Sequence, residues 1–285
     1  MSSNSKRSSS MGEPWIYYRI YVDALSRTSP LLEGVAAALQ PIRPRLRHWH
    51  FLQYLDHQGP HLRVRIQPLH AGTVDADEWG RALEQAAAQA GMGSARVLRR
   101  HYGPEAVKFG GALGLEVAHQ LFTNSSDLAA QLRPIAGVAS EDLCAGSMLA
   151  LVDAAAGRLP EGFLYHYGWY WLGRGTLGGG WRSALLARSR DSRAMLALGE
   201  RTWRAGDEIL ADPTIGVGLR AHATRLCTVL DQNPPQGWGQ SVALVAHHHL
   251  HLTNNRLGIE PAIEARVARL LALGSGRRAG AAAAR

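Results

Sequence analysis

The first third of the chain contains short runs in which apolar and polar residues alternate, as in half-buried β-strands. In the clearest run, HLRVRIQ, three apolar residues share one face while His61, Arg63 and Arg65 share the other. Runs rich in aromatic and β-branched residues predict further strands at 15–22, 49–55 and 97–101. The turn-forming segment DHQGP joins two of the strands into a hairpin.

Between and after these strands, apolar residues recur at the three- and four-residue spacing of helices. The predicted helices cover 31–39, 75–91, 115–121, 127–132, 139–156, 181–210, 215–230, a long helix from Gln240, and 261–273. The fold class is therefore α+β, with an N-terminal antiparallel sheet and its helices followed by a mostly α-helical part. Segment 162–181 fits neither pattern, because it combines six Tyr and Trp residues with seven glycines.

Both ends of the chain have the composition of disordered tails, at 1–13 and 274–285, so a single catalytic domain is expected over 14–273. No apolar run reaches the ~18 residues of a membrane-spanning helix. The N-terminus lacks the apolar stretch of a secretory signal. The two cysteines, Cys144 and Cys227, are too few for a disulfide scaffold or a Cys-based zinc ribbon. These features predict a cytoplasmic protein.

The chain is basic, with 31 Lys and Arg residues against 23 Asp and Glu residues and a net charge of +8. Such a charge can serve an acidic peptide or a nucleic acid, or it can reflect a general bias toward arginine. The absence of an uninterrupted basic stripe favours the bias, and the absence of a recognition motif argues against nucleic acid.

Four segments could carry chemistry, and the fourth is the aromatic segment 162–181. Arg63 and Arg65 project from the same strand face, where they could hold a carboxylate or a peptide, or could simply face solvent. Glu105 and Lys108 are three residues apart ahead of Gly110-Gly111, and could be no more than a surface pair. The third cluster is the HHHLHLTNNRLG segment, which ends a helix at a glycine.

In that segment, His247 and His251 have the i, i+4 spacing of a zinc-binding pair. The sequence offers no HExxH motif, so an acid–base role for a histidine beside Asn255 and Arg256 is the better interpretation. The aromatic segment 162–181 could form a wall for flat heterocycles or consist of core aromatics and a loop. No P-loop, Rossmann or nucleophile-elbow motif occurs.

Four blocks occur in the order found in one known family: WIYYRIYV, WHFLQYLDHQGPHLRVRI, YGPEAVKFGG with AHQLF, and HLTNNRLG. Over about residues 15–270, the chain resembles the small C-terminal domain of class I lanthipeptide dehydratases, and more closely the stand-alone thiopeptide-type bacteriocin biosynthesis proteins. The resemblance implies one of two chemistries on a precursor peptide, and neither uses a metal or another cofactor. One branch removes glutamate from glutamylated Ser or Thr. The other joins two dehydroalanines in a formal [4+2] cycloaddition, which forms a pyridine and releases the leader peptide.

Two departures favour pyridine synthesis over elimination. Lys108 stands where the eliminating branch carries an arginine, and lysine cannot grip a carboxylate through two donors. The sequence Asn124-Ser125-Ser126 replaces an Asp-Ser pair of that branch. The resemblance makes His251 the proton-transfer group, positioned by Asn255 and Arg256, in a pocket with Glu105 and Lys108. The remaining substrate-binding residues that it implies are Arg63, Arg65, His61 and Tyr102, with Tyr165, Tyr167, Trp169 and Trp171 packing against azoles.

Two alternatives stay open at this point. In glutamate elimination, Arg63 and Arg65 would hold the glutamate carboxylate and His251 would shuttle the proton. An inactive partner would instead bind an acidic leader through its Arg-rich strands and stabilise a dehydratase complex. In each case the expected partner is a precursor peptide with its leader, with other biosynthetic enzymes of the pathway as further partners and no membrane.

Overall fold

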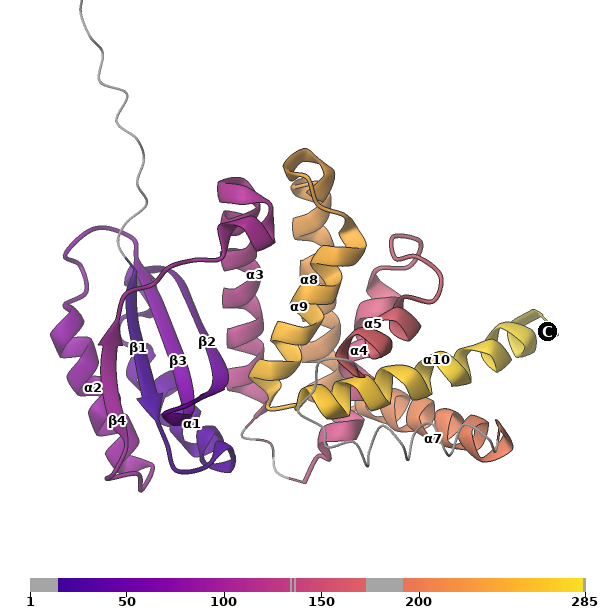
Figure 1. The fold of residues 1–285 in the computed structure, drawn as a ribbon, viewed down its shortest axis with the longest axis horizontal. Helices are drawn as coiled ribbons and strands as arrows, with labels where there is room; N and C mark the ends of the chain where they lie inside the picture. The colour runs from indigo at the N-terminus through magenta and orange to yellow at the C-terminus, as the bar shows by residue number, and fades with distance from the viewer. Residues whose placement is uncertain (1–14, 134, 136, 173–191, 284–285) are drawn as a thin grey trace, which may run out of the picture.

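The N-terminal part of the chain folds as a β-α-β-β-α-β unit (Figure 1). The computed structural model describes residues 15–133, 135, 137–172 and 192–283. The unit consists of β1 (Ile16–Tyr21), α1 (Thr28–Leu39), β2 (Leu46–Asp56), β3 (Gly59–Pro68), α2 (Ala76–Gln89) and β4 (Arg96–Arg100). The strands lie in the order β2-β3-β1-β4, and all neighbours are antiparallel. This is the ferredoxin-like arrangement, and it confirms the predicted hairpin and the α+β class.

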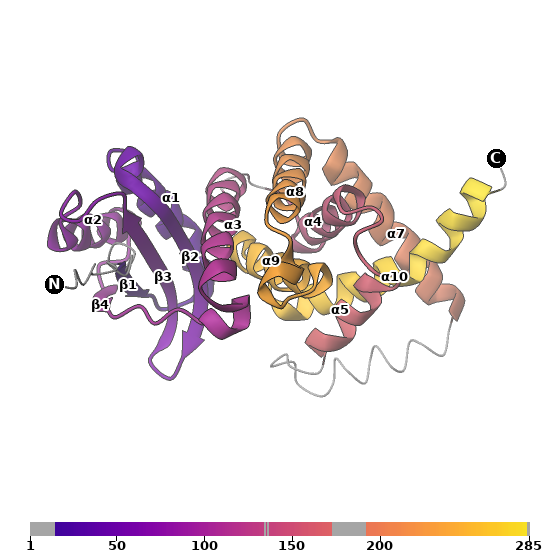
Figure 2. The ribbon, with the colours of Figure 1, turned by 90° about the horizontal axis from the view of Figure 1, so that it is seen from above.

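Helices α1 and α2 cover one face of this sheet (Figure 2). Ile20, Leu62 and Val64 point to that face and are fully buried against the helices. The Tyr18 hydroxyl donates a hydrogen bond to the Ala76 carbonyl at 2.8 Å. The other face of the sheet carries no helix of this unit (Figure 2). Polar and charged side chains of β1, β3 and β4 therefore stay available on it.

The rest of the chain is helical and lies beside β2 (Figures 1 and 2). Its helices are α3 (Gly111–Leu132), α4 (Ser140–Ala154), α5 (Phe163–Leu172), α7 (Ser192–Ala211), α8 (Ile215–Gln232), α9 (Val242–Leu257) and α10 (Pro261–Ala283). Helix α4 packs against α7, α8 and α10, and its Cys144 and Met148 are fully buried. Within the described ranges, none of the helices is long and apolar enough to span a bilayer.

Two helices close the outer edge of β2 with side chains. The N–H groups of Trp49, Phe51 and Gln53 donate to Thr123 Oγ1 at 3.3 Å, Ser126 Oγ at 3.3 Å and Asn255 Oδ1 at 2.9 Å. Alternate N–H groups of an edge strand point away from the sheet, so each of them needs such a partner. The contacts join the sheet to α3 and α9 and fix the two parts of the molecule against each other.

The prediction of two helices at 115–121 and 127–132 was wrong, because α3 is continuous through that region. The intervening Thr, Asn and Ser residues have poor helix propensity, but Thr123 and Ser126 bond to β2. The predicted helix at 261–273 continues as α10 to Ala283, through a segment whose glycines disfavour a helix and whose alanines favour one. The predicted N-terminal tail and the 181–191 part of a predicted helix lie outside the described residues.

Candidate active site

A pocket of about 1350 Å³ lies between the open face of the sheet and the C-terminal helices. Its walls come from β2 and β3, from the 3₁₀ helix η3 (Ala106–Phe109), and from α5, α9 and the start of α10. The residues singled out in the sequence that line it are Arg63, Arg65, Tyr102, Glu105, Lys108, Trp171, His251 and Asn255. Side chains far apart in the sequence therefore meet in one cavity. The carboxylate of Glu105 pairs with Lys108 Nζ at 3.5 Å at its rim.

His251 is held in one orientation by a buried carboxylate. Its Nδ1 lies 3.0 Å from Oε1 of Glu264, which is fully buried on α10. Glu264 also accepts hydrogen bonds from the Asn254 amide at 3.2 Å and from the Tyr167 hydroxyl. With Nδ1 engaged by the carboxylate, Nε2 is the nitrogen that His251 can present to the pocket.

Aromatic packing fixes the plane of the same imidazole. The Trp171 ring stacks on His251, with 3.8 Å between ring centroids and 23° between planes. On the buried side, Tyr167 is fully enclosed, and burial and the neighbouring Glu264 raise the pKa of its hydroxyl well above the usual value. Tyr167 therefore stays protonated and donates to Glu264. Such an arrangement can orient a histidine for acid–base chemistry.

Opposite His251, the pocket is lined by arginines stacked on tyrosines. The Arg65 guanidinium lies 4.7 Å from the ring centroid of Tyr17 and 4.8 Å from that of Tyr102. Arg63 lies 3.4 Å over the Tyr54 ring, and its Nε donates to His61 Nε2 at 3.2 Å. Among the described residues, neither arginine has a carboxylate partner. The two side chains thus present guanidinium donors to whatever occupies the pocket.

Arg256 lies behind this wall, fully buried, with its guanidinium 4.9 Å from the Phe122 ring. Its Nη1 donates to the Leu252 carbonyl, while its Nε and Nη2 have no partner among the described residues. Burial, with a smaller contribution from Arg65, lowers the pKa of Arg256 to about 9, so it remains cationic at neutral pH. A second buried cation therefore adds to the positive potential at the floor of the pocket.

The model of one protein family matches nearly the whole folded chain, over residues 15–273: lantibiotic biosynthesis dehydratase, C-terminal. The chain belongs to this lantibiotic dehydratase C-terminal family. The resemblance inferred from the four sequence blocks is thereby confirmed. No curated protein sequence matches the chain.

Three solved structures share the fold of this dehydratase-family chain. The tRNA-dependent lantibiotic dehydratase MibB from Microbispora sp. 107891 matches with a TM-score of 0.66 and 22% identity, over 95% of this chain and 28% of MibB. The pyridine synthase TbtD from thiomuracin biosynthesis matches with a TM-score of 0.62 and 18% identity, over 94% of this chain and 99% of TbtD. TsrL matches with a TM-score of 0.64 and 15% identity, over 93% of this chain and 96% of TsrL. The dehydratase-family chain thus spans under a third of the length of MibB.

Several predicted site residues of the dehydratase-family chain do not line the pocket. His61 is fully buried and supports Arg63, and Arg256 lies behind the wall. Tyr165 and Trp169 are exposed on the other side of α5, where both rings stack on Arg269. The segment that the sequence left undecided forms helix α5 up to Leu172, and residues 173–181 lie outside the described part.

The helical spacing of α5 explains this division of the predicted azole wall. Residues 165 and 169 share one face, while residues 167 and 171 share another. Tyr167 is enclosed and bonded to Glu264, so Trp171 alone of the four predicted aromatics lines the cavity. Tyr170, which is not among the predicted azole-packing residues, lines it as well.

Glu264 was also missed, although its position carries a signal. Counting along α10, it shares a face with the fully buried Ala268 and Leu271, at i, i+4 and i+7. A carboxylate on the apolar face of a helix needs a buried partner, and His251 is that partner. The suggested zinc pair has no such support, since no group of three or more His, Cys, Asp or Glu among the described residues could hold a metal.

Asn255 ties the pocket to the sheet. Its side-chain amide accepts from the Gln53 N–H at 2.9 Å and donates to the Gln53 carbonyl at 3.0 Å, while its own carbonyl accepts from Gln53 Nε2 at 2.6 Å. We expect Asn255→Ala to lower the free energy of unfolding by about 2–3 kcal/mol, because backbone groups of β2 lose their partners. Urea denaturation measures this. The exposed Gln232→Ala is the matched control, and equal stability of the two variants would contradict the bridging role.

Neutral histidines pack beside the pocket and should make stability depend on pH. Burial lowers the pKa of His119 to about 4, against 6.5 for an unfolded histidine. Between these values the unfolded state binds more protons, so the stability present above pH 6.5 is lost as pH falls toward 4. From pH 7 to pH 5, His119 should account for about 1–2 kcal/mol of lost unfolding free energy.

The check is denaturation at pH 7 and pH 5 for the wild type and two variants. In His119→Gln, the unfolding free energy lost between pH 7 and pH 5 should be smaller than in the wild type by about 1–2 kcal/mol, whatever the stability of the variant at pH 7. In the exposed His57→Gln it should match the wild type. An undiminished loss in His119→Gln would show that other groups control the acid transition.

Proposed function

We propose that this chain is a thiopeptide pyridine synthase, which joins two dehydroalanines of a precursor peptide in a formal [4+2] cycloaddition and releases the leader peptide. The observation that carries the proposal is the oriented His251–Glu264 pair at a pocket of about 1350 Å³. That volume exceeds the roughly 300–1000 Å³ of pockets for small molecules. It suits a peptide whose two reacting segments must enter together. The match along 99% of the pyridine synthase TbtD supports the same choice.

In this proposal the pocket acts first by holding diene and dienophile in contact. One dehydroalanine reacts through the imidic-acid tautomer of its preceding amide, and correct placement of the two partners lowers the barrier by several kcal/mol. Arg63 and Arg65 donate hydrogen bonds to amide oxygens as the tautomer and adduct form. Trp171 and Tyr170 provide flat apolar surfaces against which azole rings pack.

His251 then moves the protons that aromatisation requires. Its Nε2 removes a proton from the adduct and returns it to the departing hydroxyl or to the nitrogen of the leader amide. Glu264 stabilises the imidazolium that exists between these transfers. At the rim of the pocket, the Glu105 carboxylate partly neutralises the charge of Lys108. A lysine at this position also cannot bind a carboxylate through two parallel donors, as an arginine would.

Glutamate elimination is the second candidate, and one specific observation favours it. Arg65 is 7% exposed, reaches the pocket and has no carboxylate partner among the described residues. A buried guanidinium that has no carboxylate partner can bind the carboxylate of a glutamylated side chain strongly, through two charge-assisted hydrogen bonds. His251 would then remove the α-proton, and the glutamate would leave as a carboxylate.

Mass spectrometry on two synthetic peptides separates the candidates. One carries a leader, azoles and two dehydroalanines, and the other carries a glutamylated serine. Loss of water and leader from the first peptide, with pyridine absorbance, supports cycloaddition. Loss of glutamate from the second supports elimination and refutes cycloaddition if the first is untouched. Turnover of neither, with binding retained, matches an inactive leader-binding partner.

A further inference from the structure

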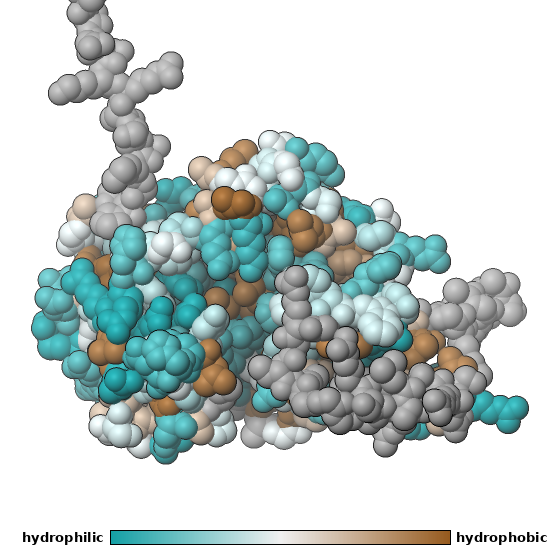
Figure 3. All heavy atoms as spheres, viewed as in Figure 1, coloured by the Kyte–Doolittle hydropathy of each residue, from teal (hydrophilic) through white to brown (hydrophobic). Residues whose placement is uncertain are grey.

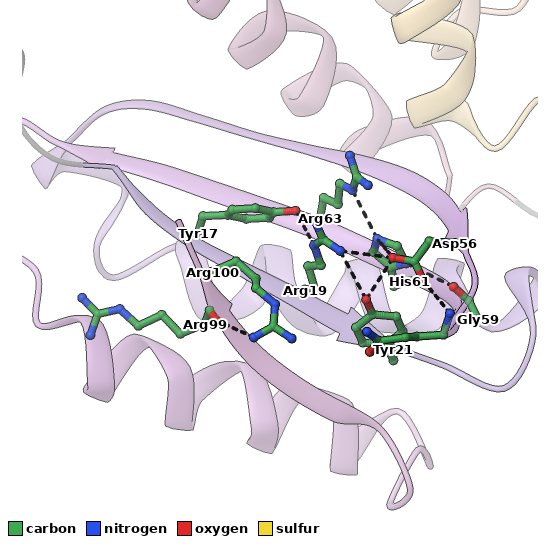
Figure 4. A network of polar contacts seen from close by, with 10 residues as sticks. Tyr17, Arg19, Tyr21, Asp56, Gly59, His61, Arg63, Arg99 and Arg100 are labelled. Atoms are coloured by element: carbon green, nitrogen blue, oxygen red, sulfur yellow. Dashed lines mark hydrogen bonds and ion pairs between the residues drawn. The ribbon is translucent and has the colours of Figure 1, made fainter. Parts of the chain in front are cut away.

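The open face of the sheet carries a grid of arginines, of which Arg19, Arg63 and Arg100 are labelled in Figure 4. Cross-strand pairing in β1, β3 and β4 puts Arg65, Tyr17 and Arg100 in one row, Arg63, Arg19 and Leu98 in the next, and His61, Tyr21 and Arg96 in the third. Rows are separated by two residues, about 6.5–7 Å along a strand. Five of these nine positions are arginine. Figure 3 shows hydrophilic residues gathered on this side of the molecule.

Tyrosines hold four of the five arginines of this grid in place, all except Arg100. Arg19 Nε donates to the Tyr17 hydroxyl at 2.8 Å, and the Arg96 guanidinium lies 4.9 Å from the Tyr21 ring centroid. Such contacts orient the cations over the sheet before any partner arrives. Holding the arginines in place lowers the entropic cost of binding an anion.

The positive charge of this face is largely uncompensated. Asp56 pairs with Arg19 at 3.1 Å. Among the described residues, Arg63, Arg96 and Arg100 have no carboxylate partner. Arg99, which points to the opposite face, does pair with Asp77 at 3.3 Å. The excess of cations is thus specific to the open face.

We propose that this arginine grid docks an acidic, extended segment of the substrate peptide while the reacting residues occupy the pocket. The proposal rests on the proposed function for the identity of the peptide. Carboxylates on alternate residues of an extended strand repeat at about 6.5–7 Å, which matches the separation of the rows. Each carboxylate can accept two N–H donors from one guanidinium.

The grid continues directly into the pocket, which supports a shared ligand. Arg63 and Arg65 belong to both surfaces. A segment aligned with β1 and β4 would lie beside β3, so the chain needs only one turn toward β3 to enter the pocket. His251 and Trp171 form the opposite wall of that pocket.

The rings of the grid argue against single-stranded nucleic acid as the ligand. Proteins that bind single strands on a sheet present exposed aromatic faces on which bases stack. Here Tyr17 and Tyr21 are each 4% exposed and lie beneath guanidinium groups. Tyr54 is more exposed, but Arg63 covers one face of its ring. Peptide carboxylates need only the guanidinium groups, and Arg96 and Arg100 of the grid are exposed.

The test is fluorescence anisotropy with three labelled probes: a 12-residue peptide with Glu at alternate positions, the same peptide with Gln instead, and a 12-nucleotide single-stranded RNA. The full-length protein is compared with Arg96→Gln/Arg100→Gln, which changes two exposed arginines of β4 outside the pocket. The matched control is Arg81→Gln/Arg204→Gln, with the same charge change on α2 and α7. Circular dichroism melting verifies that all three proteins are folded.

We expect the Glu peptide to bind more tightly than the Gln peptide, with an affinity that falls as salt is raised. The grid variant should weaken that binding about tenfold, and the control should weaken it less than about twofold. Equal binding of the two peptides, or equal loss in the control, would overturn the proposal. So would tighter binding of the RNA that is lost in the grid variant.

Binding and chemistry can fail separately. If the Glu peptide binds the grid but neither synthetic substrate is converted, docking stands and the proposed function does not. If the peptide with two dehydroalanines is converted while the Glu and Gln peptides bind equally, the proposed function stands and docking on this face is wrong.

Discussion

Replacing His251 by asparagine is expected to lower the turnover number about 10²–10⁴-fold, the range that a general acid–base group contributes. The asparagine amide can still donate to Glu264 from about the place of Nδ1, but it offers no group in place of Nε2. The fold should therefore be retained while proton transfer is lost. Product formation is measured by mass spectrometry on whichever peptide the wild type converts.

Two controls make this result specific to the imidazole. His70→Asn changes an exposed histidine after β3 and should leave turnover unaltered. Added imidazole should restore part of the rate of His251→Asn, because the pocket is wide enough to admit it. Wild-type turnover in a folded His251→Asn protein would remove the residue from the mechanism.

Glu264→Gln is expected to reduce the turnover number about 10²-fold, with little change in KM. The glutamine keeps the size of the side chain and can still accept from His251 Nδ1, but it lacks the charge that stabilises the imidazolium. Glu264 is fully buried and does not line the pocket, so substrate affinity should not depend on it. Steady-state kinetics gives both parameters.

A spectroscopic readout distinguishes this positioning role from a merely structural one. The proton between His251 Nδ1 and Glu264 should give a downfield NMR resonance in the wild type, and Glu264→Gln should lose it or shift it upfield. Glu208→Gln, an exposed charge change on α7, is the matched control for both measurements. A larger effect on KM than on the turnover number would place Glu264 in substrate binding instead.

The strands and most helices were predictable because their patterns are local. The alternation in HLRVRIQ places Arg63 and Arg65 on the face away from α1 and α2, and the structure agrees. The end of α9 at Gly258 was predictable too, because glycine commonly follows the last residue of a helix. In the structure Gly258 adopts the expected positive φ, at 86°. Such features depend on neighbours in sequence, which periodicity reveals.

The pairing of distant side chains was not predictable in this way. Nothing near His251 in the sequence indicates that its partner is Glu264, which belongs to the following helix, or that Tyr167 supports this carboxylate. The glycines near Trp169 and Trp171 argued against a helix in this segment, although α5 forms there. Without the helical spacing, the sequence could not assign the four predicted azole-packing aromatics to the pocket, the core or the surface. Those contacts depend on how α5, α9 and α10 pack.

The closed edge of β2 has a consequence for how the chain reaches its native state. Helix α3 can cover the edge at Trp49 and Phe51 once it has been synthesised. The Gln53 N–H finds its partner 202 residues later, in Asn255, so that part of the edge stays uncovered until almost the whole chain has been synthesised. An uncovered edge is a template for strand pairing between molecules. A fragment ending after β4 would keep that template permanently, and we expect it to aggregate where the full chain does not. We therefore expect the C-terminal helices to keep the N-terminal sheet soluble, in addition to forming the pocket together with it.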